Sequence, residues 1–267
     1  MSITQKLKKG AAWTLGRALP IQKNKVVFSS FYGRGASDNP KAIVDALAQR
    51  PEKLDIVWLA KDPAHAGVPD NVRVVPYDTP AAIRELSTAR VWVDNCRKGA
   101  HVKKDGQYYM QTWHGFALKR IERDVADKLN TPENAAYAEY AKRDSAQIDA
   151  IISNSTFMTE IYQKSFWYHG AVLEYGSARN DILVNPPADA KQQVQQALHL
   201  PNDCQIIMYA PTFRADHSLD AYQLDYQAVC RACAQRFGGN WVMLVRLHPN
   251  VMKLAKDLKF DNQTTFD

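Results

Sequence analysis

The pair His114-Gly115 stands out because it follows the apolar run "YYMQTW" (108–113), which is typical of a buried strand. A histidine can accept a proton near neutral pH, and the missing side chain of Gly115 lets a ligand or another backbone come close. If a helix begins directly after the glycine, its free N–H groups also favour an anion. The alternative is a core histidine packed under Trp113, and the spacing alone leaves both readings open.

A second histidine stands beside an arginine in "VRLHP" (245–249). Arg246 and His248 are two positions apart, so on a strand their side chains face the same side. A guanidinium beside an imidazole suits a diphosphate better than an apolar core. The choice between packing and binding is open for His248 as well.

Further polar residues follow or precede other apolar runs. Thr212 and Arg214 come after "QIIMYAP", and Arg179 lies in "SARND" just before a predicted domain break. Arg179 is placed to clamp a ligand between domains, and the alternative is a surface arginine paired with Asp181. The segment "YGRGASDNP" (32–40) lacks the lysine of a P-loop and the G-x-G-x-x-G spacing, so it is a weak phosphate-loop candidate.

Alternating strands and helices position these residues. The predicted strands of the first part are 25–31, 54–60, 72–77, 90–95, 108–113 and 148–155. The predicted helices are 39–50 with Asn39 as its cap, 79–89 capped by Thr79, 132–148, and one starting at 156. This alternation predicts an α/β fold with a parallel sheet covered on both faces. Ligands of such sheets gather at the carboxyl ends of the strands, where His114 stands.

A break near residue 185 separates a second part. There the sequence predicts strands at 205–213 and 241–249 and a helix at 221–237. A doubly wound domain usually has more strands, so we expect this second domain to be incomplete. The predicted organisation is a basic N-terminal segment (1–25), a first domain (26–185) and a partial second domain (186–267).

Composition narrows the partners and the compartment. The net charge of +6 and the pI near 9.0 favour anionic partners, among which we expect phosphate groups and an anionic membrane surface but no nucleic acid. Cys230 and Cys233 form the only close cysteine pair and fall in a helical pattern. No second ligand pair accompanies them, so we expect thiols in a reducing cytoplasm and no metal site.

The first 25 residues carry six lysines and arginines and no acidic residue, with Trp13 among them. Nothing in the sequence has the length and apolarity of a secretory signal or a membrane span. A basic helix with an aromatic anchor can lie on an anionic membrane surface. A helix packed on the protein with a solvated basic face is the alternative.

Five segments occur in a recognisable order: "YYMQTWHGFALKRIERD", "IISNSTFMTEIY", "GSARNDIL", "YAPTFR" and "VRLHP". Together they resemble the CDP-glycerol glycerophosphotransferase family of teichoic acid primases and polymerases. The resemblance runs from the first strand to about residue 250, and its tryptophan–histidine–glycine motif is the most diagnostic part. It implies a GT-B-like fold, in which two Rossmann-like domains face a cleft.

The resemblance also implies a reaction and a site. Glycerol phosphate, or ribitol phosphate, passes from CDP-glycerol or CDP-ribitol to a hydroxyl of a lipid-linked or polyol-phosphate acceptor, and CMP is released without a cofactor. The implied catalytic residues are His114 and His248. The implied donor-binding residues are Gly115, Arg179, Thr212, Arg214 and Arg246. The first domain would then be the acceptor side and the second the donor side.

Two departures from the family pattern are visible. Phe116-Ala117 stand where many members have threonine–proline, and no threonine–aspartate–tyrosine–serine–serine motif occurs in the chain.

The alternatives are a nucleotide-sugar glycosyltransferase of the same fold and a truncated, non-catalytic binding paralogue. We expect a cytoplasmic enzyme, peripheral on the inner face of the membrane. The oligomeric state, with a homo-oligomer as one alternative, is left open.

Overall fold

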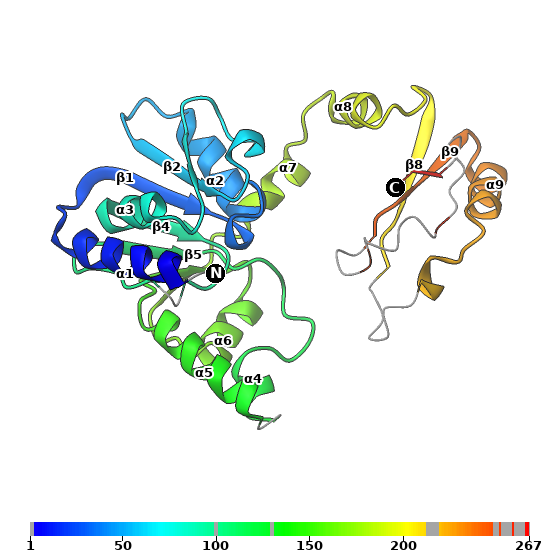
Figure 1. The fold of residues 1–267 in the computed structure, drawn as a ribbon. Helices are drawn as coiled ribbons and strands as arrows, with labels where there is room; N and C mark the ends of the chain where they lie inside the picture. Colours follow the sequence, from blue (N-terminus) through cyan, green and yellow to red (C-terminus); the bar gives the residue numbers. More distant parts are fainter. Residues whose placement is uncertain are drawn as a thin grey trace. The chain divides into compact units, whose positions relative to one another are not determined.

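The computed structural model describes residues 3–98, 101–128, 131–211, 219–247, 251, 258 and 265–266. The chain divides into two units, Met1–Asn185 and Pro186–Asp267. Each unit has its own sheet, and each is described by itself below (Figure 1).

The first unit contains a seven-stranded sheet in the order β3-β2-β1-β4-β5-β6-β7, with every neighbouring pair parallel. Its strands are β1 (Gln22–Ser29), β2 (Asp55–Ala60), β3 (Arg73–Pro76), β4 (Ala89–Asp94), β5 (Tyr108–Gln111), β6 (Ala150–Ile152) and β7 (Ala171–Leu173). The α/β prediction is therefore confirmed. All six predicted strands form, whereas β7 was not predicted.

Strand β1 shows why the predicted strands read as continuous apolar runs. Val26 and Phe28 belong to one hydrophobic core and Val27 to another. Alternate side chains of a strand point to opposite faces of its sheet. A strand covered on both faces therefore needs apolar residues at every position.

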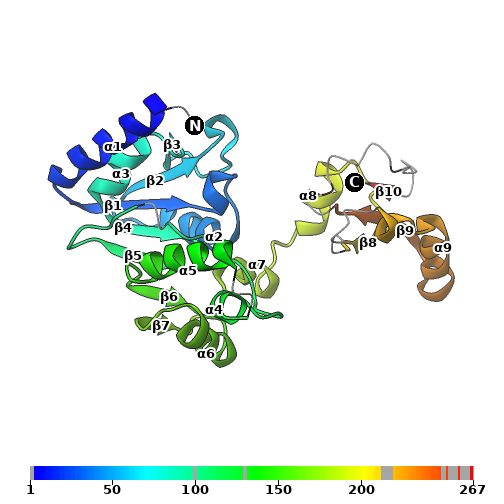
Figure 2. The same cartoon turned by 60° about the horizontal axis from the view of Figure 1, so that its bottom comes forward.

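Helices cover both faces of this sheet (Figures 1 and 2). On one face α2 (Asp38–Ala48) contributes Val44 to the core. On the other face α3 (Pro80–Thr88) contributes Leu86, and α6 (Thr156–Ser165) contributes Met158. The remaining helical segments of this unit are α1 (Ile3–Ala18), η1 (Phe31–Gly33), η2 (Pro63–His65), α4 (Arg123–Ala126), α5 (Pro132–Ser145), η3 (Ala178–Asn180) and α7 (Asp181–Val184).

Helix starts follow local capping chemistry in part. The Thr79 hydroxyl accepts a hydrogen bond from the backbone N–H of Ala82, which confirms the predicted cap, and Pro80 takes the first position of α3. The cap predicted at Asn39 is wrong. Helix α2 spans Asp38–Ala48 with Ser37 at its cap position, and Asp38 itself has a left-handed φ of 64°. The side chain of Asn39 is thereby released for another contact, described below.

The basic helix α1 packs on the protein. Gly16 lies so close to α3 that an added Cβ would stand 2.3 Å from the hydroxyl oxygen of Ser87. The ring of Trp13 is half-buried against the core and lies 5.0 Å from the ring of His101, and Lys9 pairs with Asp78 at 2.5 Å. Trp13 is thus a packing residue of the first unit rather than an exposed anchor. No helix among the described residues is long and apolar enough to cross a membrane.

The second unit has a three-stranded parallel sheet in the order β10-β9-β8. Its elements are α8 (Ala190–Ala197), β8 (Cys204–Tyr209), η4 (Asp220–Tyr222), α9 (Tyr226–Phe237), β9 (Asn240–Val245) and β10 (Thr265–Phe266). Helix α9 buries Cys230 and half-buries Cys233, as predicted for thiols. Within the described ranges no group of three histidine, cysteine or acidic residues could hold a metal ion.

Candidate functional site

His114 stands at the carboxyl end of β5, at the edge of the sheet where α/β proteins bind ligands. The chain leaves the strand through Trp113, whose φ of 51° lies in the left-handed region. The backbone N–H of Trp113 is held by the side-chain oxygen of Gln111 (2.9 Å), and that of Thr112 by the carbonyl of Asp94 (2.9 Å). The sheet thus fixes the backbone on which the histidine is carried.

The imidazole of His114 is half-buried between aromatic rings. It stacks on Trp113 with ring centroids 4.4 Å apart and an interplanar angle of 21°, and the ring of Phe31 lies 5.6 Å away. Among the described residues none hydrogen-bonds to its ring nitrogens. Because the ring is only half-buried and its nitrogens are not enclosed, the geometry leaves these nitrogens available to a substrate.

Burial lowers the pKa of His114 below its ordinary value. Asp38 acts in the opposite direction, whereas the positive charge of Arg179 lowers the pKa further. The imidazole is therefore neutral at pH 7 and has a free lone pair. A neutral imidazole is the form that can accept a proton from a hydroxyl group.

The segment after His114 differs from the prediction. No helix begins at Gly115, and α4 starts only at Arg123. The intervening loop is held against α6 instead, because Phe116 stacks on Phe157 (5.3 Å) and the backbone N–H of Ala117 donates to the sulfur of Met158 (3.3 Å). The condition for a helix dipole at Gly115 is therefore not met.

Gly115 itself lies in open space. An added Cβ would meet no atom within 4 Å, so packing within the first unit does not require a glycine there. Its expected role in the close approach of a ligand stays a prediction.

Arg179 does lie beside His114. Its Nη1 donates to the carbonyl oxygen of His114 (2.9 Å) and pairs with Asp38 Oδ2 (2.9 Å), not with Asp181 as the alternative had it. Its backbone N–H donates to the side-chain oxygen of Asn39 (3.1 Å), whose amide nitrogen reaches the carbonyl of Thr112 (3.4 Å). The segments around α2, β5 and η3 are thus joined at the histidine.

The sequence did not single out Asp38 as a site residue, and it indicated Asn39 only as a helix cap. Both belong to "YGRGASDNP", a segment weighed only as a phosphate loop. Only their position could have indicated them, because they follow the first predicted strand and so lie at the same edge of the sheet as His114.

Other polar residues at this edge are engaged with one another. The Ser29 hydroxyl donates to Asp94, and Lys98 Nζ reaches both Asp94 Oδ2 (2.7 Å) and the Ser29 oxygen (2.9 Å), all of them buried. This cluster lies between β1 and β4, where the strand order reverses. The neighbouring Asn95 accepts from the backbone N–H of Phe31 (2.9 Å) and so holds the ring that faces His114.

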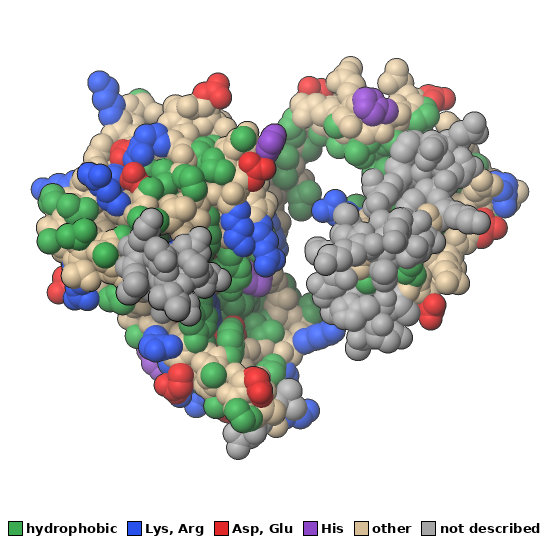
Figure 3. All heavy atoms as spheres, viewed as in Figure 1, with side chains coloured by type: hydrophobic (Ala, Val, Ile, Leu, Met, Phe, Trp, Pro, Cys, Tyr) green, Lys and Arg blue, Asp and Glu red, His purple; other side chains and the backbone are tan. Residues whose placement is uncertain are grey.

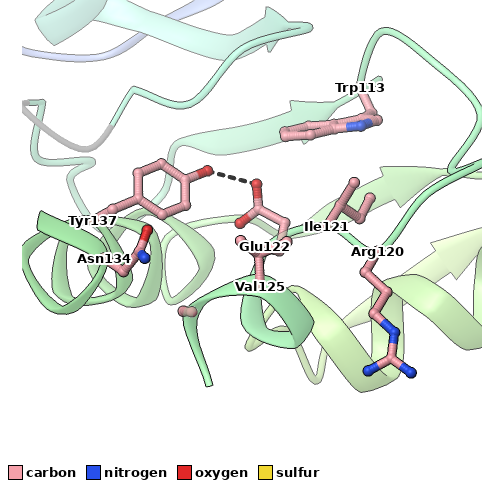
Figure 4. Close-up of a pocket in the computed structure, with 8 residues that line it drawn as sticks. Trp113, Arg120, Ile121, Glu122, Val125, Asn134 and Tyr137 are labelled. Carbon is pink, nitrogen blue, oxygen red and sulfur yellow. Dashed lines mark hydrogen bonds between the residues drawn. The ribbon is translucent and has the colours of Figure 1, made fainter. Parts of the chain in front are cut away.

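A cavity of about 330 Å³ lies beside Trp113, which forms part of its lining. Figure 4 shows the hydroxyl of Tyr137 pointing at the carboxylate of Glu122, at 2.6 Å, and the Arg120 side chain turned away from both. The cavity is lined by Trp113, Arg120, Ile121, Glu122, Val125, Ala126, Asn134 and Tyr137. On the visible face of the first unit, lysine and arginine side chains are spread out rather than gathered in one patch (Figure 3).

The second unit supplies less of the predicted site. Strand β9 ends at Val245, so Arg246 lies beyond the strand rather than on it; its side chain is exposed and its backbone N–H donates to the carbonyl of Tyr209 (2.9 Å). Thr212, Arg214 and His248 lie outside the described residues. Of the seven predicted site residues, the first unit brings together His114, Gly115 and Arg179.

Comparison with known proteins places these features in a family. The family model described as CDP-Glycerol:Poly(glycerophosphate) glycerophosphotransferase matches residues 12–266. The chain is 32% identical over 235 residues to the teichoic acid poly(glycerol phosphate) polymerase of Staphylococcus epidermidis, and 31% identical over 236 residues to the teichoic acid glycerol-phosphate transferase of Staphylococcus aureus. Both matches cover 85% of this chain, and the chain spans 33% and 60% of those two proteins.

Solved structures agree with this assignment. A structure of the wall teichoic acid polymerase TagF superposes with a TM-score of 0.80 at 28% identity, over 100% of this chain and 70% of the TagF chain. A TagF variant soaked with CDPG gives the same TM-score and identity. Because the family model matches residues 12–266, nearly the whole chain, the chain belongs to the CDP-glycerol:poly(glycerophosphate) glycerophosphotransferase family.

Proposed function

We propose that this protein transfers glycerol phosphate, or ribitol phosphate, from a CDP-linked donor to a hydroxyl of a lipid-linked or polyol-phosphate acceptor in the synthesis of a teichoic-acid-like polymer. The observation that carries the proposal is the neutral, half-buried His114, whose ring nitrogens have no hydrogen-bond partner among the described residues. Family membership supports the donor class. The related proteins are named for glycerol phosphate polymerisation or transfer.

The proposed step is attack on phosphorus. The acceptor oxygen bonds to the β-phosphorus of the donor while the imidazole of His114 takes the hydroxyl proton. The bond from that phosphorus to the bridging oxygen breaks, and CMP leaves with the electron pair. Positively charged side chains beside the diphosphate stabilise the negative charge of the leaving CMP. We assign this role to His248, Arg214 and Arg246.

Arg179 has a different role in this proposal. Its guanidinium is already paired with Asp38 and bound to the carbonyl of His114, and its side chain is 38% exposed. It orients the histidine loop and leaves part of its guanidinium facing solvent, where it can meet a donor phosphate. Gly115 and Thr212 complete the proposed donor contacts.

The proposed architecture is GT-B-like. Residues 26–185 form the acceptor-side domain, which carries the base, and residues 186–267 belong to the donor-binding domain. The exposed side chains of α1, such as Leu15 and Arg17, favour the proposed peripheral attachment to the inner face of an anionic membrane. That attachment weakens with salt, because charge attraction is screened within about 10 Å at 0.1 M. Equal binding to neutral vesicles would contradict it.

The deciding experiment measures CMP release by the full chain from CDP-glycerol and from CDP-ribitol, with a glycerol-phosphate-bearing lipid acceptor. Parallel reactions contain UDP- or GDP-sugars and the same acceptor. We expect turnover of a CDP-polyol only. Consumption of a nucleotide sugar with none of the CDP-polyols would indicate a glycosyltransferase, and donor binding without turnover would indicate a non-catalytic binding protein.

A further inference from the structure

Arg97 is a buried cation that the proposed reaction does not use. Its side chain is 3% exposed, and it lies just after β4, three residues beyond Asp94. Nη2 donates to Glu122 Oε2 (2.7 Å), and Nη1 donates to Asp144 Oδ2 (3.2 Å), to the Ser145 hydroxyl (2.9 Å) and to the carbonyl of Ala141 (3.0 Å). One guanidinium thus ties the end of β4 to α5 and to the loop that follows His114.

The same guanidinium lies against the aromatic residues under His114. Its central carbon is 5.8 Å from the ring centre of Trp113 and 5.5 Å from that of Phe166, both within the usual range of a cation–π contact. Those two rings meet edge to face at 4.7 Å. The indole of Trp113 is therefore in contact with the guanidinium and Phe166 as well as with the imidazole of His114.

The backbone on either side of the histidine loop needs this support. Trp113 has φ of 51° and Glu122 has φ of 56°, left-handed values that cost a bulky residue energy unless its surroundings impose them. Arg97 contacts the Trp113 ring and bonds to the Glu122 carboxylate, which Tyr137 also holds (2.6 Å). The two strained residues are thus fixed by one side chain.

We propose that Arg97 is a positioning residue for His114: its guanidinium fixes the Trp113 indole, on which the imidazole stacks, and so sets the direction in which the ring nitrogens point. This inference rests on the proposed role of His114 as base. Arginine suits the task because its planar fork bonds in several directions at once and also stacks on aromatic rings. A buried ion pair often adds little stability compared with an apolar replacement, so conformational specificity is the stronger reason for placing one here.

The test is Arg97→Lys in the full chain. Lysine keeps the positive charge beside Glu122 and Asp144 but cannot make the forked bonds or cover the indole. The matched control is Lys25→Met, which removes another buried cation of the same sheet, paired with Glu85 at 2.6 Å in the first unit. Both variants lose a buried ion-pair contact, but only Arg97 contacts Trp113.

Two measurements are made on each variant. For turnover, we expect kcat of Arg97→Lys to fall about 10²-fold, the usual cost of a misplaced catalytic group, while the donor KM stays within about twofold. For the histidine itself, we expect its imidazole NMR resonance, assigned by its loss in His114→Ala, to shift and its pKa to rise as the ring becomes more exposed. The charged groups that act on the pKa of His114, namely Asp38, Arg179, Glu122 and Asp94, are all unchanged in this variant.

The outcomes separate the possibilities. Lys25→Met is expected to lose stability without moving the His114 resonance or kcat. If Arg97→Lys behaves like that control, Arg97 is only structural and the inference is overturned. If Arg97→Lys does not fold, Glu122→Gln is tested in its place, because glutamine keeps the shape of the glutamate side chain. The His114 resonance and kcat are measured in the same way. If both equal the wild-type values, the inference is overturned. A wild-type chain without turnover would refute the proposed function, while the NMR comparison would still decide the positioning role.

Discussion

Replacement of His114 by alanine distinguishes a reacting histidine from a packed one. The side chain has no hydrogen bond to any described residue, so its loss leaves no described partner unsatisfied. It contacts the rings of Trp113 and Phe31, and an aromatic pair contributes about 0.5–1.5 kcal/mol. We therefore expect the free energy of unfolding to fall by about 1–2 kcal/mol, which leaves a stable domain folded at 25 °C.

Turnover should change far more than stability. Removal of a general base costs on the order of 10²–10⁴-fold in rate. The assay is CMP release from the CDP-polyol donor at a temperature where thermal unfolding curves show both proteins fully folded. Donor affinity should stay close to that of the wild type, because the base contacts the acceptor hydroxyl rather than the diphosphate.

His101 provides a matched control in the same unit. It also lies against a tryptophan, Trp13, at 5.0 Å, but its Nδ1 is enclosed without a hydrogen-bond partner among the described residues. Burial lowers its pKa to about 3, and Lys98 and Lys9 act in the same direction. His101→Ala should lose stability and keep its turnover wherever it is folded.

The pH dependence gives an independent check. Because burial lowers the pKa of His114, the imidazole stays neutral to a lower pH than an ordinary histidine. The acid limb of kcat/KM, which reports groups of the free enzyme, should therefore lie below about pH 6.5. A folded His114→Ala protein with near-normal turnover, or a wild-type acid limb above the ordinary histidine value, would refute the assignment of His114 as base.

The sequence predicted the first unit well because its signals are local. Apolar runs gave six of the seven strands of the sheet, and Thr79 gave the start of α3. The errors lie where distant contacts decide the local structure. The sequence left open whether a helix begins after Gly115, and contacts with α6 hold that segment as a loop.

The site was predicted in part for the same reason. His114 could be found from its place at a strand end, and Arg179 from its place beside the domain break. Its partner Asp38 is 141 positions away in the chain, and no local pattern signals such a pairing. Arg97 was missed because a cation following a strand looks the same in sequence whether it faces solvent or, as here, enters a core.

Two further substitutions test the packing of α1 and the electrostatics of the site. Gly16→Ala should lower the free energy of unfolding by about 1–3 kcal/mol, because its Cβ would stand 2.3 Å from the facing serine of α3. Gly10→Ala on the same helix, with nothing within 4 Å, should instead raise it by up to about 1 kcal/mol, and equal effects in chemical denaturation would contradict the packing. Asp38→Asn removes the carboxylate that raises the pKa of His114, so that pKa should fall and the acid limb of kcat/KM should move to lower pH. The control is Asp45→Asn on the same helix, where the carboxylate pairs with a surface lysine at 2.5 Å, and this variant should leave the acid limb at its wild-type pH. If the acid limb of Asp38→Asn moves to higher pH or does not move, a group other than His114 determines its position.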